Sequence, residues 1–207
     1  MKTARILVMA DDTVPAFYDY YRPGVFDGID LIISCGDLPA RYLSFIATLF
    51  KGDVLYVPGN HDERFLSHPP EGCICIDDRI FVWKGLRILG LGGSFWYKPG
   101  PYQYSEEQMK SRIRRLRYQL WRRKGFDLLV THAPARGHND GCDLPHRGFE
   151  CFLELIEKYK PKYFVHGHVH MNYGSYPRFT MLQETAVINA YQRFVIEVPV
   201  EDDKLGK

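Results

Sequence analysis

The feature that most constrains the fold is an alternation of short apolar runs with stretches of helical periodicity. Helical patterns lie at 39–50, 105–124 and 147–160. Near-continuous apolar runs are typical of strands that are covered on both faces, and their alternation with helices predicts an α/β fold with largely parallel strands. After the last helical pattern, the stretch 176–198 has short apolar segments only, so antiparallel strands are expected there. The six runs span 4–10, 30–35, 53–58, 87–93, 127–132 and 162–167.

Composition narrows the class of protein. The 207 residues are 45% hydrophobic and 25% charged, which is ordinary for a globular enzyme, and a single domain over 1–207 is expected. The net charge of +2 names no polyanionic partner. No run approaches the ~20 apolar residues of a membrane helix, and the first one is too short for a secretory signal. With five cysteines and no Cys-x-x-Cys pair, we expect reduced thiols in a cytoplasmic protein. The polar end, 201–207, is expected to fray.

The chemically active side chains fall directly after the predicted strands. In open α/β sheets the carboxyl ends of the strands form the crevice in which ligands bind. Carboxylate, amide and imidazole groups are ligands for Mn, Fe or Zn. Two such ions ~3.5–4 Å apart suit in-line attack at phosphorus. The residues are Asp11, Asp37, Asn60, His61, His132, His168 and His170.

Four motifs occur in order: Gly-Asp at 36–37, GNHD at 59–62, the Thr-His of THAP at 131–132 and GHVH at 167–170. Together they resemble the calcineurin-like metallophosphoesterases, over about residues 4–190. The resemblance implies a four-layer αββα sandwich of two mixed β-sheets flanked by helices. It also implies hydrolysis of a phosphodiester or phosphomonoester by in-line attack of a metal-bound hydroxide, with two divalent ions.

The resemblance assigns metal ligands residue by residue, with one departure. The first motif of the family is usually Asp-x-His, but here Asp11 and Asp12 are followed by Thr13, so the expected imidazole is absent. We therefore expect weaker binding at this site and a preference for harder ions such as Mn²⁺. Thr13 is a candidate extra ligand or substrate contact. The implied ligands are Asp37 bridging the two ions, Asn60, His132 and His168 at one site, and Asp11 and His170 at the other.

Further polar residues are candidates for catalysis or substrate binding. The resemblance implies that His61 lies near the leaving-group oxygen as a general acid or charge stabiliser. It implies that Asp62 holds His61 in the right tautomer and orientation. His138 and His146 lie in a Gly-rich loop that follows the Thr-His motif. They are either phosphate contacts or replacement ligands, or they order the loop near the start of the next helix. Trp96 and Tyr97 are expected to help form the wall of the site.

The strongest charge feature is the stretch 110–124, with eight basic residues and no acidic one. It is either a solvated outer face or a surface that recruits RNA or another polyanion by counterion release.

Two functions from different classes remain open. The first is a phosphoesterase acting on a small phosphorylated substrate, with a nucleotide or cyclic nucleotide favoured because 207 residues leave no room for a large cap domain. The second is a binding or scaffold module that keeps the fold without catalysis, which the missing imidazole favours. Hydrolysis of an aryl phosphate with Mn²⁺ distinguishes them.

Overall fold

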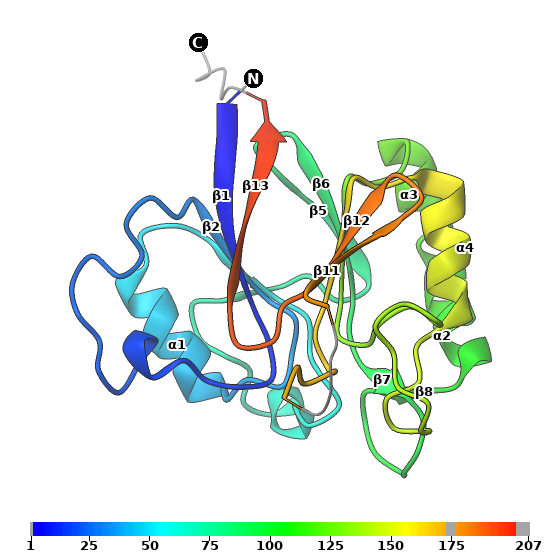
Figure 1. Ribbon diagram of the computed structural model, residues 1–207, viewed down its shortest axis with the longest axis horizontal. Helices are drawn as coiled ribbons and strands as arrows, with labels where there is room; N and C mark the ends of the chain where they lie inside the picture. The colour runs from blue at the N-terminus through cyan, green and yellow to red at the C-terminus, as the bar shows by residue number, and fades with distance from the viewer. Residues whose placement is uncertain (1, 173–176, 202–207) are drawn as a thin grey trace.

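The computed structural model describes residues 2–172 and 177–201. Two mixed β-sheets pack face to face and helices cover the outer face of each, so the expected αββα sandwich is confirmed (Figure 1). In these two ranges no helix is long and apolar enough to cross a membrane. Of the stretch 201–207, expected to fray, all residues except Glu201 lie outside the described part.

The first sheet has five strands in the spatial order β13-β1-β2-β3-β4. The strands β1 to β4 run parallel, and β13 lies antiparallel beside β1 at one edge. Because parallel neighbours point the same way, the carboxyl ends of β1, β2 and β3 lie at the same edge. The strands are β1 (Lys2–Met9), β2 (Leu31–Ser34), β3 (Val54–Tyr56), β4 (Ile74–Cys75) and β13 (Phe194–Val200).

The second sheet has six strands in the order β11-β12-β10-β9-β6-β5. Its four central strands are parallel, and β11 and β5 are antiparallel at the edges. The expectation of antiparallel strands over 176–198 holds for β11 and β13. It is wrong for β12, which pairs with β10 in parallel. The β11–β12 hairpin reverses the direction of the chain, so β12 runs the same way as β10. The strands are β5 (Arg79–Trp83), β6 (Leu86–Leu91), β9 (Leu128–Thr131), β10 (Tyr163–His166), β11 (Phe179–Leu182) and β12 (Thr185–Asn189).

The helix expected over 105–124 is two helices. The amide of Leu116 bonds to the carbonyl oxygen of Ile113 at 3.0 Å, one residue short of the α-helical pattern. Beyond this turn, the side chain of Gln119 accepts a hydrogen bond from the backbone amide of Ile80 on the edge strand β5. The break therefore lets the second helix pack against that edge. The helices are α1 (Ala40–Leu49) on the first sheet and α2 (Glu106–Arg115), α3 (Arg117–Arg123) and α4 (Glu150–Tyr159) on the second. Two 3-10 turns lie at Pro15–Phe17 and Glu63–Leu66. The strands β7 (Ser94–Phe95) and β8 (Gln103–Tyr104) form a separate pair.

Three apolar clusters join the four layers. The central cluster lies between the sheets and includes Ile6 and Val8 of β1. The intervening residues Leu7 and Met9 belong to the cluster between the first sheet and α1. The third cluster joins the second sheet to α2, α3 and α4. Since successive side chains of a strand point to opposite faces, β1 is buried on both, which explains its unbroken apolar sequence.

Candidate metal centre

The residues expected to bind metal come together at one end of the sandwich. The loops after β1, β2 and β3 of the first sheet meet the loops after β9 and β10 of the second. A cavity of about 400 Å³ opens between them, and His132 lies fully buried at the site. Side chains that are distant in the sequence thus share one cavity. Its lining residues are Asp11, Asp37, Asn60, His61, Tyr97, Pro145, His146, His168 and His170.

Two buried histidines, His132 and His168, point ring nitrogens at each other. His132 Nδ1 donates to the carbonyl oxygen of Cys35 at 2.8 Å, and His168 Nε2 donates to that of Pro145 at 2.7 Å. A carbonyl oxygen only accepts, so these nitrogens carry the ring protons. In the neutral rings, His132 Nε2 and His168 Nδ1 therefore carry lone pairs, and these two atoms lie 3.1 Å apart. Two converging lone pairs require a shared proton or a metal ion, and such backbone contacts are how proteins orient histidine ligands.

Two oxygen atoms complete this group of acceptors. Asn60 Oδ1 lies 3.0 Å and Asp37 Oδ2 3.3 Å from His132 Nε2. Asn60 Nδ2 donates to the hydroxyl of Tyr97, which turns the amide oxygen toward the histidines. Among the described residues, Asp37, His132 and His168 are the one group of three or more His, Cys, Asp or Glu side chains whose ligand atoms all lie within 4.8 Å of one another. One carboxylate, one amide and two imidazoles fit Mn, Fe or Zn.

Burial and charge compete over the protonation of this group. Burial disfavours the charged forms of both Asp37 and His132, but their mutual attraction outweighs it. The pKa of Asp37 consequently lies well below its usual range, and the pKa of His132 is raised to about 9. Burial and the charge of His132 lower the pKa of His168 to about 3. In the metal-free protein a proton on His132 thus occupies the place of a cation, so metal binding is expected to release it.

Three candidate ligands have a left-handed backbone conformation. The φ angle is +68° at Asp11, +58° at Asp37 and +69° at His168. Residues other than glycine rarely adopt this region, and strain of this kind clusters at functional sites. A hydrogen bond joins two of these residues and thereby links the loops after β1 and β10. The carboxylate of Asp11 accepts the backbone amide of His168 at 3.0 Å. All three side chains line the cavity.

Gly36 and Gly59, which open the Gly-Asp and GNHD motifs, permit a close approach of two loops. A Cβ atom on Gly36 would lie 2.5 Å from the backbone nitrogen of Gly59, and one on Gly59 would lie 2.7 Å from that of Asp37. Both distances are far below van der Waals contact, so any larger residue would push the loops after β2 and β3 apart.

The part of the site around Asp11 and His170 is more loosely arranged. His170 Nε2 lies 3.9 Å from Asp11 Oδ1, and the His170 ring packs on Tyr191 with centroids 4.9 Å apart. The hydroxyl of Tyr191 donates to the carboxylate of Asp12. Thr13 is exposed and is not among the residues that line the cavity, so the suggested ligand or substrate contact from Thr13 has no support in the structure.

The expected contact between Asp62 and the ring of His61 is not among the hydrogen bonds of the described residues. Instead, one carboxylate oxygen of Asp62 accepts the backbone amides of Asp37 and Gly59, each at 2.8 Å. Burial, together with the nearby charge of Asp37, raises the pKa of Asp62 to about 7. His61 lines the cavity, and its backbone amide donates to Asp37 Oδ1 at 2.8 Å. Asp62 therefore positions the loop that carries His61, and not the imidazole itself.

Of the two loop histidines, His146 lines the cavity and His138 does not. The ring of His146 lies 5.4 Å from that of His168, and its Nδ1 is 2.7 Å from the carboxylate of Asp143. The backbone amide of His138 bonds to the carbonyl group three residues earlier, which is a loop-ordering contact. Of the two residues expected to form the wall of the site, Tyr97 lines the cavity and Trp96, which is 52% exposed, does not.

The sequence does not predict the groups that orient the candidate metal ligands. Cys35 and Pro145 act through their carbonyl oxygens, which every residue possesses, so residue type carries no signal. Tyr191 supports Asp12 and His170 from the segment between β12 and β13, and its place in the chain gives no hint of this contact.

With this geometry established, comparisons with known proteins assign the family. The model of the calcineurin-like phosphoesterases matches residues 8–172, and the chain belongs to this family. It is similar to the UPF0046 protein C25E10.12 of Caenorhabditis elegans, with 25% identity over 156 residues, covering 64% of this chain and 49% of that protein. It is also similar to the probable rhamnogalacturonate lyase C of Emericella nidulans, with 25% identity over 173 residues, covering 74% of this chain and 16% of that protein.

A solved structure shares the fold. The crystal structure of TT1561 of Thermus thermophilus superimposes with a TM-score of 0.62 at 17% identity, covering 92% of this chain and 90% of that one. At this identity the likeness concerns the fold alone. The chain spans about half the length of the first curated relative and a much smaller part of the second.

Proposed function

We propose that the chain is a metal-dependent phosphoesterase that hydrolyses a phosphomonoester or phosphodiester. It would use two divalent ions drawn from Mn, Fe or Zn. The observation that carries the proposal is the convergence of the two imidazole lone pairs, 3.1 Å apart, beside the oxygens of Asp37 and Asn60. Buried acceptors that face one another are costly unless a proton or a cation lies between them, and one divalent cation satisfies all four. A pure scaffold has no need of such an arrangement.

The residues divide the work as follows. Asp37, Asn60, His132 and His168 would hold one ion, and Asp11 and His170 would hold the other together with Asp37. When bound, the ions would lower the pKa of a water molecule and polarise the phosphoryl oxygens. His61, which lines the cavity, would donate a proton to the leaving-group oxygen. Asp62 would keep the loop of His61 in place through its two amide contacts.

Hydrolysis of phenyl phosphate and para-nitrophenyl phosphate with Mn²⁺ tests the function. For the poorer leaving group, phenol, replacing His61 by alanine is expected to lower kcat by about 10²–10⁴-fold, the usual contribution of a general acid. The loss should be smaller for para-nitrophenol, which leaves readily without a proton. His138→Ala is the matched control, because His138 does not line the cavity. Absence of hydrolysis of these monoesters and of the diester bis(para-nitrophenyl) phosphate by the wild type with Mn²⁺, Fe²⁺ or Zn²⁺ would instead support the binding or scaffold module.

Metal binding is expected to occur in two unequal steps. Thr13 replaces the imidazole that the family usually supplies beside Asp11, so the site of Asp11 and His170 has fewer nitrogen ligands and should bind Mn²⁺ more weakly. Calorimetric titration with Mn²⁺ should resolve a tight step and a weak one, and His170→Ala should remove the weak step only. Two steps of equal, tight affinity would contradict this prediction.

We also infer that α3 and the end of α2 form a polyanion-binding surface, the basic surface. Arg112 does not belong to it, because this side chain is buried and paired with Asp77 and Asp78. Lys110 pairs with Glu154. The exposed members are Arg114, Arg115, Arg117, Arg122, Arg123 and Lys124.

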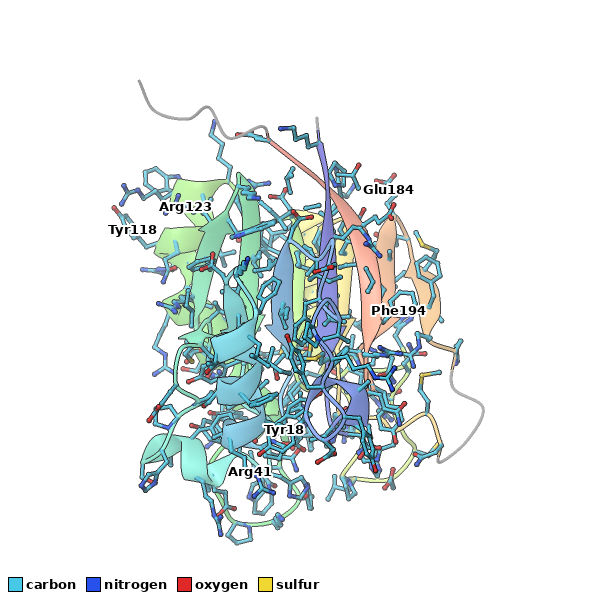
Figure 2. The ribbon with its side chains drawn as sticks, turned by 90° about the vertical axis from the view of Figure 1, so that its left-hand side faces the viewer. Tyr18, Arg41, Tyr118, Arg123, Glu184 and Phe194 are labelled. Carbon is cyan, nitrogen blue, oxygen red and sulfur yellow. The ribbon has the colours of Figure 1, made fainter. Side chains whose placement is uncertain are left out.

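Two exposed aromatic rings favour single-stranded nucleic acid as the partner of the basic surface. Tyr118 is 63% and Trp121 76% exposed, and their ring centroids are 6.1 Å apart. Figure 2 shows Tyr118 and Arg123 at the same corner of the molecule. Rings of this kind stack on bases while basic groups bind phosphates.

A fluorescent oligouridylate tests the basic surface. Its binding should weaken steeply with salt, and Trp121→Ala should weaken it by about 5–100-fold, the usual value of one stacked base. Tyr20→Ala, at an equally exposed ring outside the basic surface, should leave binding unchanged. Binding that is independent of salt or of Trp121 would refute the proposal.

We place the enzyme in the cytoplasm. All five cysteines are free, which supports a reducing compartment. A nucleotide or cyclic nucleotide remains the favoured type of substrate.

A further inference from the structure

A second and larger cavity adjoins the metal centre. Its volume is about 930 Å³, and His61 lines both cavities, so this residue stands at their junction. The start of α1 and the 3-10 turn after the GNHD motif form its walls. The lining residues are Pro39, Ala40, Arg41, His61, Asp62, Glu63, Arg64, Phe65, Ser67 and His68.

The ionic groups of this cavity are two arginines and two carboxylates. Arg41 and Arg64 are both exposed, and neither guanidinium has an ion-pair partner among the described residues. Of the acidic members, Asp62 is 5% exposed and occupied by backbone amides. The carboxylate of Glu63 lies beside Gly100, on the loop between β7 and β8. Two guanidinium groups therefore remain available to a ligand.

The position of His61 between the two cavities indicates which part of a substrate would enter the second one. In the proposed function, the phosphoryl group sits in the metal cavity and His61 faces the leaving-group oxygen. The rest of the leaving group must then extend past His61, away from the metal ligands, and the second cavity is the space that His61 borders on that side. Phe65, which is 8% exposed, adds an apolar surface to its lining.

We propose that Arg41 and Arg64 form a leaving-group subsite that selects phosphate esters whose alcohol carries a second anionic group, a phosphate or a carboxylate. This inference rests on the proposed function and deepens it by naming the substrate class. Guanidinium groups bind both anions through paired, charge-assisted hydrogen bonds. A nucleotide with a further phosphate belongs to this class, and an ester of an uncharged alcohol does not.

Two phosphate esters on the same ring, one with an anionic and one with a neutral para substituent, test the subsite. The para-carboxyphenyl phosphate and its methyl ester have the same ring, and only the first presents an anion to Arg41 and Arg64. With Mn²⁺ present, kcat/KM is expected to favour the carboxylate by at least about tenfold, the scale of one hydrogen bond to a charged group. The double variant Arg41→Gln/Arg64→Gln should abolish this preference by lowering kcat/KM for the carboxylate.

Arg22→Gln is the matched control, because Arg22 is exposed and lines neither cavity. Calorimetric binding of the same two esters to the wild type and to the double variant supplies a readout that needs no turnover. Para-phosphonophenyl phosphate, used in parallel, shows whether phosphorus-based anions are preferred to carboxylates.

The outcomes separate the subsite from the proposed function. Hydrolysis of both esters without preference, or a preference that survives in the double variant, would overturn the subsite while the phosphoesterase stands. Hydrolysis of neither ester, and none of the diester bis(para-nitrophenyl) phosphate, would overturn the phosphoesterase, and the binding data would still decide the subsite. Tighter binding of the carboxylate that depends on Arg41 and Arg64 would support it, and equal binding of both esters would refute it.

Discussion

Asp37→Asn is expected to abolish hydrolysis and the tight metal-binding step together. Asp37 Oδ2 lies 3.3 Å from His132 Nε2, and Asp37 Oδ1 accepts the backbone amide of His61 at 2.8 Å. As the proposed bridge, this carboxylate serves both ions as well as the loop of His61. Removing a metal ligand that stabilises the transition state by several kcal/mol is expected to lower kcat by at least about 10³-fold. Phosphate release and Mn²⁺ calorimetry would measure both effects.

The control for this variant is Asp53→Asn, at an exposed aspartate whose contact to β2 is made by its backbone carbonyl group. It should retain wild-type activity and metal binding. The isosteric change at Asp37 should leave the thermal unfolding midpoint high enough for the protein to be folded in the assay. A folded Asp37→Asn protein with undiminished activity would contradict the assignment of the metal centre.

Arg112→Met is expected to lower the free energy of unfolding by about 3–5 kcal/mol, the usual cost of leaving a buried charge unpaired. The Arg112 side chain is 3% exposed. Its guanidinium donates to Asp77 at 2.6 Å, to Asp78 at 2.9 Å and to the carbonyl oxygen of Gly92 at 2.7 Å. It also lies over the ring of Tyr104, 4.2 Å from the centroid. Denaturant unfolding monitored by circular dichroism would measure the change.

Two further variants show whether the loss comes from the unpaired carboxylate. Arg114→Met changes an exposed arginine of the same helix and should alter stability by less than about 0.5 kcal/mol. Arg112→Met combined with Asp77→Asn should recover part of the loss, because the buried charge left by the first change is then removed. Equal stability of Arg112→Met and the wild type would show that the network contributes nothing.

The apolar runs predicted the central strands well because burial on both faces leaves no room for polar alternation. The run 127–132, for example, contains β9 (Leu128–Thr131). The edge strand β5 (Arg79–Trp83) was not predicted, since its pattern mixes exposed and buried residues. The helical periodicity over 105–124 was real, but a contact with that same edge strand decided where the helix breaks.

The sequence by itself determined the family and the metal-ligand candidates, because Asp, Asn and His at strand ends have few structural reasons to occur together in this order. Only the tertiary structure decided which ring nitrogens face the candidate metal position, since carbonyl oxygens of Cys35 and Pro145 orient them. It likewise decided that Asp62 holds backbone amides and that Arg112 is buried, because a charge finds its partner by position in space and not by distance along the chain.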